Sequence, residues 1–237
     1  MTAAFLAKLI PIPGFSEPFS SLSHLAGAVL FAALTVPLLR RAHKGLSDYR
    51  SRRIGLLIFS FGAVFLLSMS GVYHLLSPSG AGRQVLQRLD HAAIFVLIAS
   101  SFTPIHLILF RGWGKWGVLV LIWSLAITAI VLKTVYFNEM PVMLGLLMYL
   151  GLGWVGLGTG IAIWRRRGFA FVAPILWGGL AYSIGAVLEF VKSPIIIPGV
   201  IQWHEVFHIA VLMGLAFHWS FIYSIADAEP RTDRITG

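Results

Sequence analysis

The hydropathy pattern of this 237-residue chain consists of seven long apolar stretches, separated by short segments that contain polar residues, proline and glycine. An α-helix needs about 20 apolar residues to cross a hydrocarbon core about 30 Å thick. The pattern therefore predicts an all-α fold, a polytopic membrane protein with a seven-transmembrane helix bundle. The expected helices cover approximately residues 20–39, 54–76, 90–110, 116–135, 141–163, 170–190 and 203–226.

The same pattern predicts the domain organisation. Residues 1–19 are expected to form an irregular or interfacial lead-in, residues 20–226 the transmembrane domain, and residues 227–237 a polar tail too short for a second domain. The first apolar stretch does not resemble a cleavable signal peptide, because Arg40 and Arg41 follow it in place of a small-residue cleavage site. We expect it to remain as the first helix.

Composition agrees with a membrane protein and limits the chemistry. Hydrophobic residues make up 58% of the chain and charged residues 11%, whereas about one-quarter of a soluble domain is charged. The sequence contains no cysteine. Any metal ion would therefore be bound by nitrogen and oxygen ligands.

The net charge of +9 comes from basic residues that mostly flank the expected helices. With seven spans, 13 of the 18 lysine and arginine residues fall on the side of the C-terminus and 5 on the other side. The positive-inside rule then predicts an external N-terminus and a cytoplasmic C-terminus. Anionic membrane lipids, and not nucleic acid, are the expected partners of these basic segments.

Polar side chains at the ends of three expected helices fall at one depth in the membrane. His204 and His208 are four residues apart, a spacing of about 6 Å in rise and about 40° in rotation, so both imidazoles can reach one metal ion. His74 ends the second helix and Asp90 begins the third, at the same end of the bundle as this pair, with Ser70 about one turn deeper. Because ionisable groups are costly inside a membrane, such a group predicts a functional site.

The residue types in this group predict a zinc site. Three neutral imidazoles and one open position form a catalytic Zn²⁺ site, and His74, His204 and His208 supply three imidazoles. Asp90 then either binds the ion directly or holds water in the fourth position as a general base. Ser70 could donate a hydrogen bond to the oxyanion of a polarised carbonyl. The expected reaction is hydrolysis of an amide or ester. The depth of the site in the membrane favours an acyl lipid as the substrate.

Three residues near this group have open roles. His204 to His208 also match His-Glu-x-x-His, in which the glutamate, here Glu205, is the base of a metalloprotease. The chain lacks the Asn-Pro-Asp-Gly or Leu-Asp-Gly stretch of intramembrane metalloproteases, so we disfavour a protease and leave the role of Glu205 open. His24 is expected either to hydrogen-bond to a neighbouring helix or to face the metal cavity, and Glu189 to be an interfacial acid or a proton carrier.

Residues 151–156 match the Gly-x-Gly-x-x-Gly pattern of dinucleotide-binding proteins. No strand precedes them, so we expect close helix contacts through Gly153, Gly156 and Gly160 instead.

Several ordered blocks carry a resemblance to a known family. They are Glu17 with Ser23-His24 and Gly27, Ser70-Gly71-Val72-Tyr73-His74, Leu89 to Ala99 followed by Phe102-Thr103-Pro104, Gly178 to Ala186, and His204 to His208. Together they resemble the hemolysin III family, the bacterial branch of the progestin and adipoQ receptor (PAQR) superfamily. The resemblance implies zinc held at His74, His204 and His208, with Asp90 acting through water. It also implies kinship to alkaline ceramidases, hence ceramidase-like or other lipid amidase activity, in the bacterial cell (inner) membrane.

Two other functions stay open under this resemblance. One is a PAQR-type receptor or regulator in which zinc is structural, and the other is a pore-forming cytolysin, although the expected helices show no polar stripe that would line a channel. Adiponectin receptors of the superfamily carry their zinc site on the cytoplasmic side, opposite to the side that the charges predict here. The sequence indicates neither the lipid nor the oligomeric state.

Overall fold

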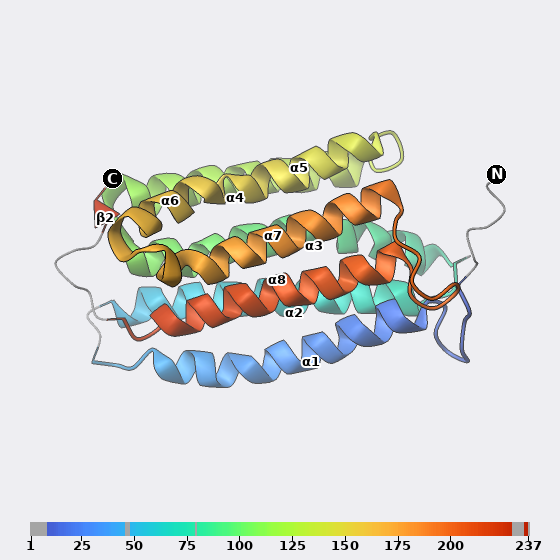
Figure 1. Ribbon diagram of the computed structural model, residues 1–237, viewed down its shortest axis with the longest axis horizontal. Coiled ribbons are helices and arrows are strands. Elements are labelled where there is room, and N and C mark those ends of the chain that lie inside the picture. Colours follow the sequence, from blue (N-terminus) through green and yellow to red (C-terminus); the bar gives the residue numbers. More distant parts are fainter. Residues whose placement is uncertain (1–8, 46–47, 79, 229–234, 237) are drawn as a thin grey trace.

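The computed structural model describes residues 9–45, 48–78, 80–228 and 235–236. Helices dominate these ranges and run roughly parallel to the long axis of the molecule (Figure 1). In chain order the elements are α1 (Pro18–Arg41), α2 (Tyr49–Leu75), α3 (Ala81–Leu109), β1 (Phe110–Arg111), α4 (Gly112–Val135), α5 (Val142–Trp154), α6 (Gly156–Arg167), α7 (Phe169–Val191), α8 (Trp203–Ile225) and β2 (Ile235–Thr236).

Seven spans are long and apolar enough to cross a membrane, with α5 and α6 forming one of them. The predicted fold class is therefore confirmed: the described chain is an all-α, seven-span bundle. Exposed side chains on the spans include Val29, Val120 and Val142, which are 73%, 64% and 74% exposed. Such a surface suits lipid, where a helix already satisfies its own backbone hydrogen bonds.

Two helices begin earlier than the hydropathy pattern predicts. The second begins at Tyr49 and not near residue 54, and the third begins at Ala81 and not near residue 90. The additional turns carry charged residues such as Arg53 and Arg88, which form helix readily but lower the local hydropathy. Hydropathy therefore marks the part of a helix that suits hydrocarbon, whereas the helix itself extends beyond it.

The fifth span is broken at Val155, although one continuous helix was predicted there. The break lies among glycines, which have low helix propensity and are common at kinks. A Cβ atom on Gly156 would stand 3.1 Å from the Phe102 ring and one on Gly160 would stand 3.6 Å from Leu176, so both glycines make the expected close contacts. The prediction for Gly153 was wrong, because no atom lies within 4 Å of its Cβ position.

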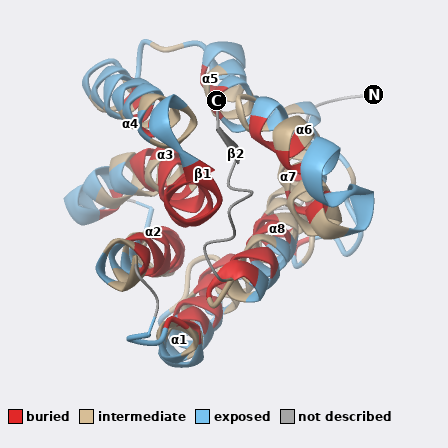
Figure 2. Ribbon diagram, turned by 90° about the vertical axis from the view of Figure 1, so that its left-hand side faces the viewer, coloured by how far each residue is buried: buried red, intermediate tan, exposed pale blue. Residues whose placement is uncertain are grey.

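The core lies between α3 and the helices around it. Figure 2 shows buried residues on the inward faces of α1, α2, α3 and α8, whereas α4, α5 and α6 are largely exposed. In the most apolar window of α3, 83% of the residues are buried, against 17% in α7. One hydrophobic cluster contains buried residues of α1, α2, α3, α6, α7 and α8. A second contains buried residues of α3, α4 and α5. The second cluster holds the outer α4 and α5 pair against the bundle.

The two ends of the bundle have different polar contacts. At one end, the buried Arg52 donates to the carbonyl oxygens of Ile225 and Ala226, at 3.3 and 3.0 Å, and so closes the end of α8. The pairing of β1 with β2 lies at this end as well (Figure 1). At the opposite end, α2 and α7 terminate and α3 and α8 begin. The predicted site residues belong to that second end.

Candidate metal centre

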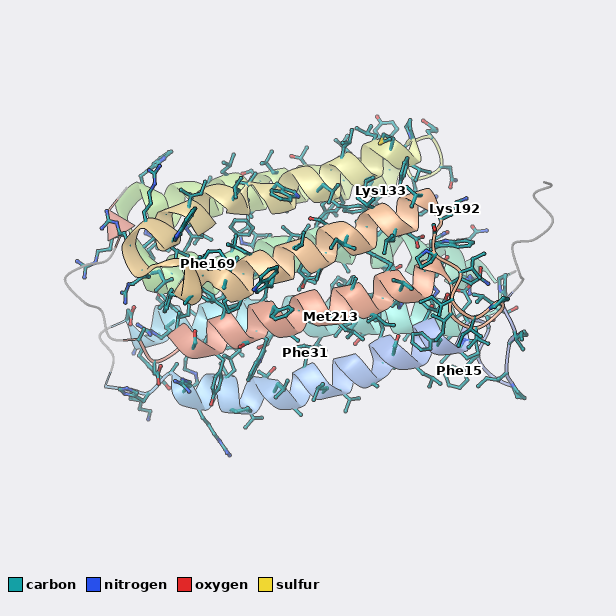
Figure 3. All side chains as sticks on the ribbon, in the orientation of Figure 1. Phe15, Phe31, Lys133, Phe169, Lys192 and Met213 are labelled. Carbon is teal, nitrogen blue, oxygen red and sulfur yellow. The ribbon has the colours of Figure 1, made fainter. Side chains whose placement is uncertain are left out.

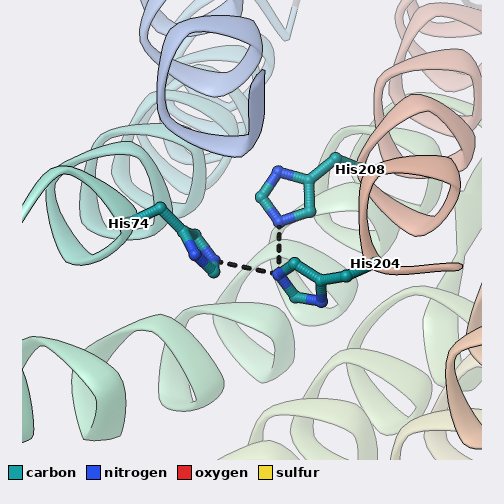
Figure 4. Close-up of side chains that lie close together, drawn as sticks. All are labelled: His74, His204 and His208. Carbon is teal, nitrogen blue, oxygen red and sulfur yellow. Dashed lines mark hydrogen bonds between the residues drawn. The ribbon is translucent and has the colours of Figure 1, made fainter. Parts of the chain in front are cut away.

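Three imidazole rings converge where α2 ends and α8 begins (Figure 4). The Nε2 atom of His204 lies 3.1 Å from the Nε2 atom of His74 and 3.1 Å from that of His208. Ligand atoms of all three residues lie within 4.8 Å of one another. The spacing of four residues places His204 and His208 on one face of α8, and His74 reaches them from the last turn of α2.

This geometry fits a bound metal ion. Nitrogen ligands about 2.0 Å from a tetrahedrally coordinated zinc ion are about 3.3 Å apart, close to the observed separations. Carboxylates sit at Nδ1 of His74 and of His204, so the ring proton of each neutral imidazole is on Nδ1 and the Nε2 lone pair is free. Two bare lone pairs at this distance repel each other, and a cation between them removes the repulsion.

The carboxylate beside His74 comes from Glu17, the residue that precedes α1. The backbone N–H of Glu17 donates to the His74 carbonyl oxygen at 3.1 Å, which fixes the lead-in to the end of α2. The Glu17 side chain accepts from His74 Nδ1 and from the Arg83 guanidinium. Burial alone would raise the pKa of Glu17, but His74 and Arg83 outweigh it and lower the pKa to about 2. Glu17 is therefore ionised and able to orient the His74 ring.

Glu189 at the end of α7 has the same relation to His204. One of its carboxylate oxygens lies 3.1 Å from His204 Nδ1. A carboxylate at the far nitrogen of a ligating histidine fixes the ring and increases its basicity. Neither role predicted for Glu189 included this one. The separation in sequence between Glu189 and His204 gave no signal, because the contact depends on the packing of α7 against α8.

His208 is held differently, by ring stacking. Its ring lies over that of His24 on α1, with centroids 3.8 Å apart and planes inclined by 20°. Within the described residues, neither ring nitrogen of His24 has a hydrogen-bond partner. Of the two predicted positions for His24, the structure shows the one against the site, where it braces a ligand ring.

Ser70 and Asp90 lie beside the three histidines. The Ser70 hydroxyl lies near the Asp90 carboxyl group, which is also close enough to His204 to interact electrostatically. Ser70 is buried, and Asp90 lies within α3, about two and a half turns after its observed start at Ala81 and not at the start of the helix as predicted. All five predicted site residues are thus brought to one end of the bundle.

Glu205 is occupied by structural hydrogen bonds. Its Oε2 accepts from the backbone N–H of Gln202 at 3.0 Å, as half of a capping box at the start of α8. Its Oε1 accepts from the Ser20 hydroxyl at 2.9 Å, which ties α8 to α1. Both oxygens thus accept hydrogen bonds from other residues, unlike the free base that the His-Glu-x-x-His pattern of metalloproteases requires.

The site is closed on one side and partly open on the other. The His74 side chain is 2% exposed, whereas those of His204 and Glu189 are 27% and 37% exposed. A small molecule could therefore reach the converging nitrogens from the side of α7 and α8.

Fold and site together define a seven-span membrane protein with a buried three-histidine group that could hold a metal ion. The chain belongs to the haemolysin-III related family, whose model matches residues 15–219. This confirms the family resemblance found in the sequence blocks, and with it an integral membrane protein.

Individual relatives agree with this family. Hemolysin-3 of Bacillus cereus is 28% identical over 204 residues, which cover 84% of this chain and 87% of the relative. The Hemolysin-3 homolog of Bacillus subtilis (strain 168) is 30% identical over 159 residues, 67% of this chain and 71% of the relative. Heptahelical transmembrane protein 1 of Arabidopsis thaliana is 26% identical over 231 residues, 86% of this chain and 68% of the relative, which is consistent with the wider superfamily.

Proposed function

We propose that this protein is a membrane-embedded, zinc-dependent hydrolase that cleaves the amide or ester bond of an acyl lipid, with ceramidase-like chemistry. The observation that carries the proposal is the convergence of three Nε2 atoms, from His74, His204 and His208, on one point of a partly open site. A structural zinc site is usually closed by four protein ligands, whereas a catalytic site has three and an open position.

Asp90 supplies the base in this proposal. Zinc bound by the three imidazoles would supply a Lewis acid and a nucleophile derived from water at neutral pH. Among the described residues, Asp90 lies outside the group of converging ligand atoms but interacts with His204. This placement supports the alternative in which Asp90 holds a water molecule and accepts its proton, over direct ligation of the ion.

Ser70 is best placed to orient Asp90. A hydroxyl group has one proton, and the Asp90 carboxyl group is the acceptor near the Ser70 hydroxyl. The predicted donation from Ser70 to a substrate oxyanion would need the hydroxyl to turn when the substrate binds. That role stays a prediction.

An acyl lipid suits the surroundings of the site. A cavity of about 190 Å³ borders Glu17 and is lined mainly by apolar side chains, among them Ile10, Ile12, Phe19 and Val200. The lead-in and the α7–α8 connection form much of its wall, and the N–H of Ile10 donates to the Gly199 carbonyl oxygen at 2.9 Å. An acyl chain could lie there while its carbonyl group faces the histidines.

The test is a lipid-hydrolysis screen on the purified full-length protein. Ceramides, N-acyl amino acids and glycerolipids in mixed micelles would be followed by mass spectrometry for release of free fatty acid. We expect turnover by the wild type, loss of about 10²-fold or more in Asp90→Asn, and no change in Glu139→Gln, which alters an exposed acid on the α4–α5 connection. Zinc-loaded protein that turns over none of these lipids would contradict the enzyme and favour a receptor or regulator with structural zinc.

We also propose the orientation that the charge distribution favours. The site would lie on the external face of a bacterial cell (inner) membrane, with the C-terminus in the cytoplasm.

A further inference from the structure

A buried lysine lies at the same end of the bundle as the histidines, in a different group of helices. Lys133 lies in the last turns of α4 (Figure 3). It is 7% exposed. Its Nζ atom lies 3.5 Å from the point where a Cβ atom on Gly145 of α5 would stand, and 5.0 Å from the centre of the Phe137 ring. The ammonium group is therefore directed between α4 and α5, into the bundle.

Lys133 has no ion-pair partner in the described part of the chain, since no acidic oxygen lies within 4.0 Å of Nζ there. A charged side chain inside a membrane is costly, and such residues nearly always pair with an opposite charge or face a polar cavity. Favourable interaction with the end of the α4 dipole accounts for a lysine in this turn, but not for its burial against Gly145.

A second cationic side chain and an imidazole ring lie beside the same aromatic ring. The Arg88 guanidinium carbon lies 5.5 Å from the centre of the Phe137 ring, and the ring of His91 lies 5.1 Å from it. Arg88 donates to the Thr134 carbonyl oxygen at 3.0 Å, and the described residues provide no second acceptor for its five N–H donors. We call Arg88 and Lys133 the basic cluster.

An unused hydroxyl group lies next to this cluster. The Tyr149 hydroxyl is buried and has no hydrogen-bond partner among the described residues. The Cε2 atom of its ring lies 4.0 Å from the Cβ position of Gly145, the same position that Lys133 approaches. Because Gly145 has no side chain, it leaves room beside both groups: an ammonium group with no ion-pair partner and a phenol with no hydrogen-bond partner among the described residues.

A hydrophobic cavity accompanies these donors. It is open to the surface, has a volume of about 490 Å³ and lies between α4 and α5, where its lining includes Leu132, Met140, Leu144 and Met148 together with the exposed acid Glu139. Three of these residues are immediate chain neighbours of Lys133, Gly145 or Tyr149. A molecule with an anionic group and an apolar chain could pair its charge with the basic cluster and place its chain in this cavity.

We propose that Lys133, Arg88 and Tyr149 form a binding site for the phosphate group of an anionic phospholipid, with an acyl chain in the adjacent cavity. Lysine and arginine are the usual cations for phosphate, and the phenol adds a third donor. The site uses α3, α4 and α5 and none of the three histidines, although Asp90 is close enough to Tyr149 to interact with it electrostatically. Lipid binding there does not require hydrolysis, and the site would hold a lipid as a resident ligand or a regulator.

The experiment compares lipid binding by purified full-length variants, with native mass spectrometry and thermal unfolding in detergent. Phosphatidylglycerol is titrated against phosphatidylcholine, oleate and inorganic phosphate. We expect the wild type to retain phosphatidylglycerol and to gain thermal stability from it, and Lys133→Met to bind it at least about 10-fold more weakly. Lys192→Met is the matched control, because Lys192 is an exposed lysine at the same end of the bundle, and it should bind as the wild type does (Figure 3).

Lys133→Met should remain folded, because replacing an uncompensated buried charge by an apolar side chain of similar length is seldom destabilising. If it does not fold, Tyr149→Phe decides the question: weaker phosphatidylglycerol binding supports the site, and unchanged binding overturns it. Equal binding by Lys133→Met and wild type would also overturn the site. Equal affinity for phosphatidylcholine or oleate, or displacement by inorganic phosphate alone, would overturn the assignment to an anionic phospholipid.

Discussion

The Nδ1 atom of His204 donates to Glu189, and this hydrogen bond directs the free lone pair of Nε2 towards His74 and His208. Glu17 does the same for His74. Individual hydrogen bonds thus decide which nitrogen of each ring is available to a cation. The third ring, that of His208, depends on its stacking against His24.

Replacement of Glu189 should weaken metal binding without changing any ligand. In Glu189→Gln the neutral amide accepts a weaker hydrogen bond, so we expect the affinity for zinc to fall by about 10-fold to 100-fold. Competition with a chromogenic chelator measures this change. Glu139→Gln, on an exposed acid at the same end of the bundle, is the control. An unchanged zinc affinity in Glu189→Gln would show that the contact does not orient the ligand.

Variants of Glu205 distinguish the proposed hydrolase from a His-Glu-x-x-His metalloprotease, in which this glutamate would be the catalytic base. Glu205→Gln keeps a side-chain acceptor for the Gln202 N–H, so it should preserve zinc content and lipid hydrolysis. Glu205→Ala removes one half of the capping box and leaves the buried Ser20 hydroxyl without its partner, at a cost of about 1–3 kcal/mol in the free energy of unfolding. Activity assays and thermal unfolding in detergent distinguish the two variants. Loss of activity in Glu205→Gln with normal zinc content would identify Glu205 as a catalytic base.

The residues of the site differ in how far the sequence could identify them. His204 and His208 were predictable because helical spacing alone places them together, and His74 and Asp90 because the chain alternates across the membrane. Glu17 and Glu189 were not predicted as partners of the rings, because those contacts depend on where the lead-in and α7 pack. Local spacing contains no information on such packing.

At the scale of the elements, close helix contacts hold the ligands in place. A Cβ atom on Gly71 of α2 would stand 2.7 Å from Cγ of Leu25 and 3.1 Å from its backbone nitrogen. Gly71 is one turn before His74, so the approach of α1 to α2 sets the position of a ligand ring and of its partner Glu17. Backbone atoms cannot move aside as a flexible side chain can.

We therefore expect Gly71→Ala to destabilise the bundle by about 1–3 kcal/mol and to weaken zinc binding, because α1 must move away from α2. Gly153→Ala is the matched control: its Cβ position is empty, and alanine is the better helix former. Thermal unfolding of both variants, with and without zinc, measures the difference. Equal stability of the two variants would contradict the role given to this contact.

The number of membrane spans was predictable, but the ends and interruptions of the helices were not. Apolar length determines how many times the chain crosses the membrane, and seven stretches gave seven spans. The charged first turns of α2 and α3 were omitted because hydropathy does not measure helix propensity. The break at Val155 depends on the glycines on either side of it, which a hydropathy window averages away.

At the scale of the whole molecule, the charge distribution determines which end faces the cytoplasm. The end with Arg52 and the C-terminus carries most of the basic residues, and the end with the histidines carries few. We expect a C-terminal fusion to a reporter active only in the cytoplasm to be active, and the same reporter at the N-terminus to be silent. The opposite pattern would place the site on the cytoplasmic side, as in the adiponectin receptors.

Metal analysis of the purified protein tests the three-histidine centre most directly. Elemental mass spectrometry should find about one zinc ion per chain in the wild type and a loss of most of it in His74→Ala, His204→Ala and His208→Ala. His43→Ala, which changes an exposed histidine outside the spans, should retain the full content. A wild-type protein that binds no zinc when it is offered, or ligand variants that retain a full complement, would contradict the site and the hydrolase built on it.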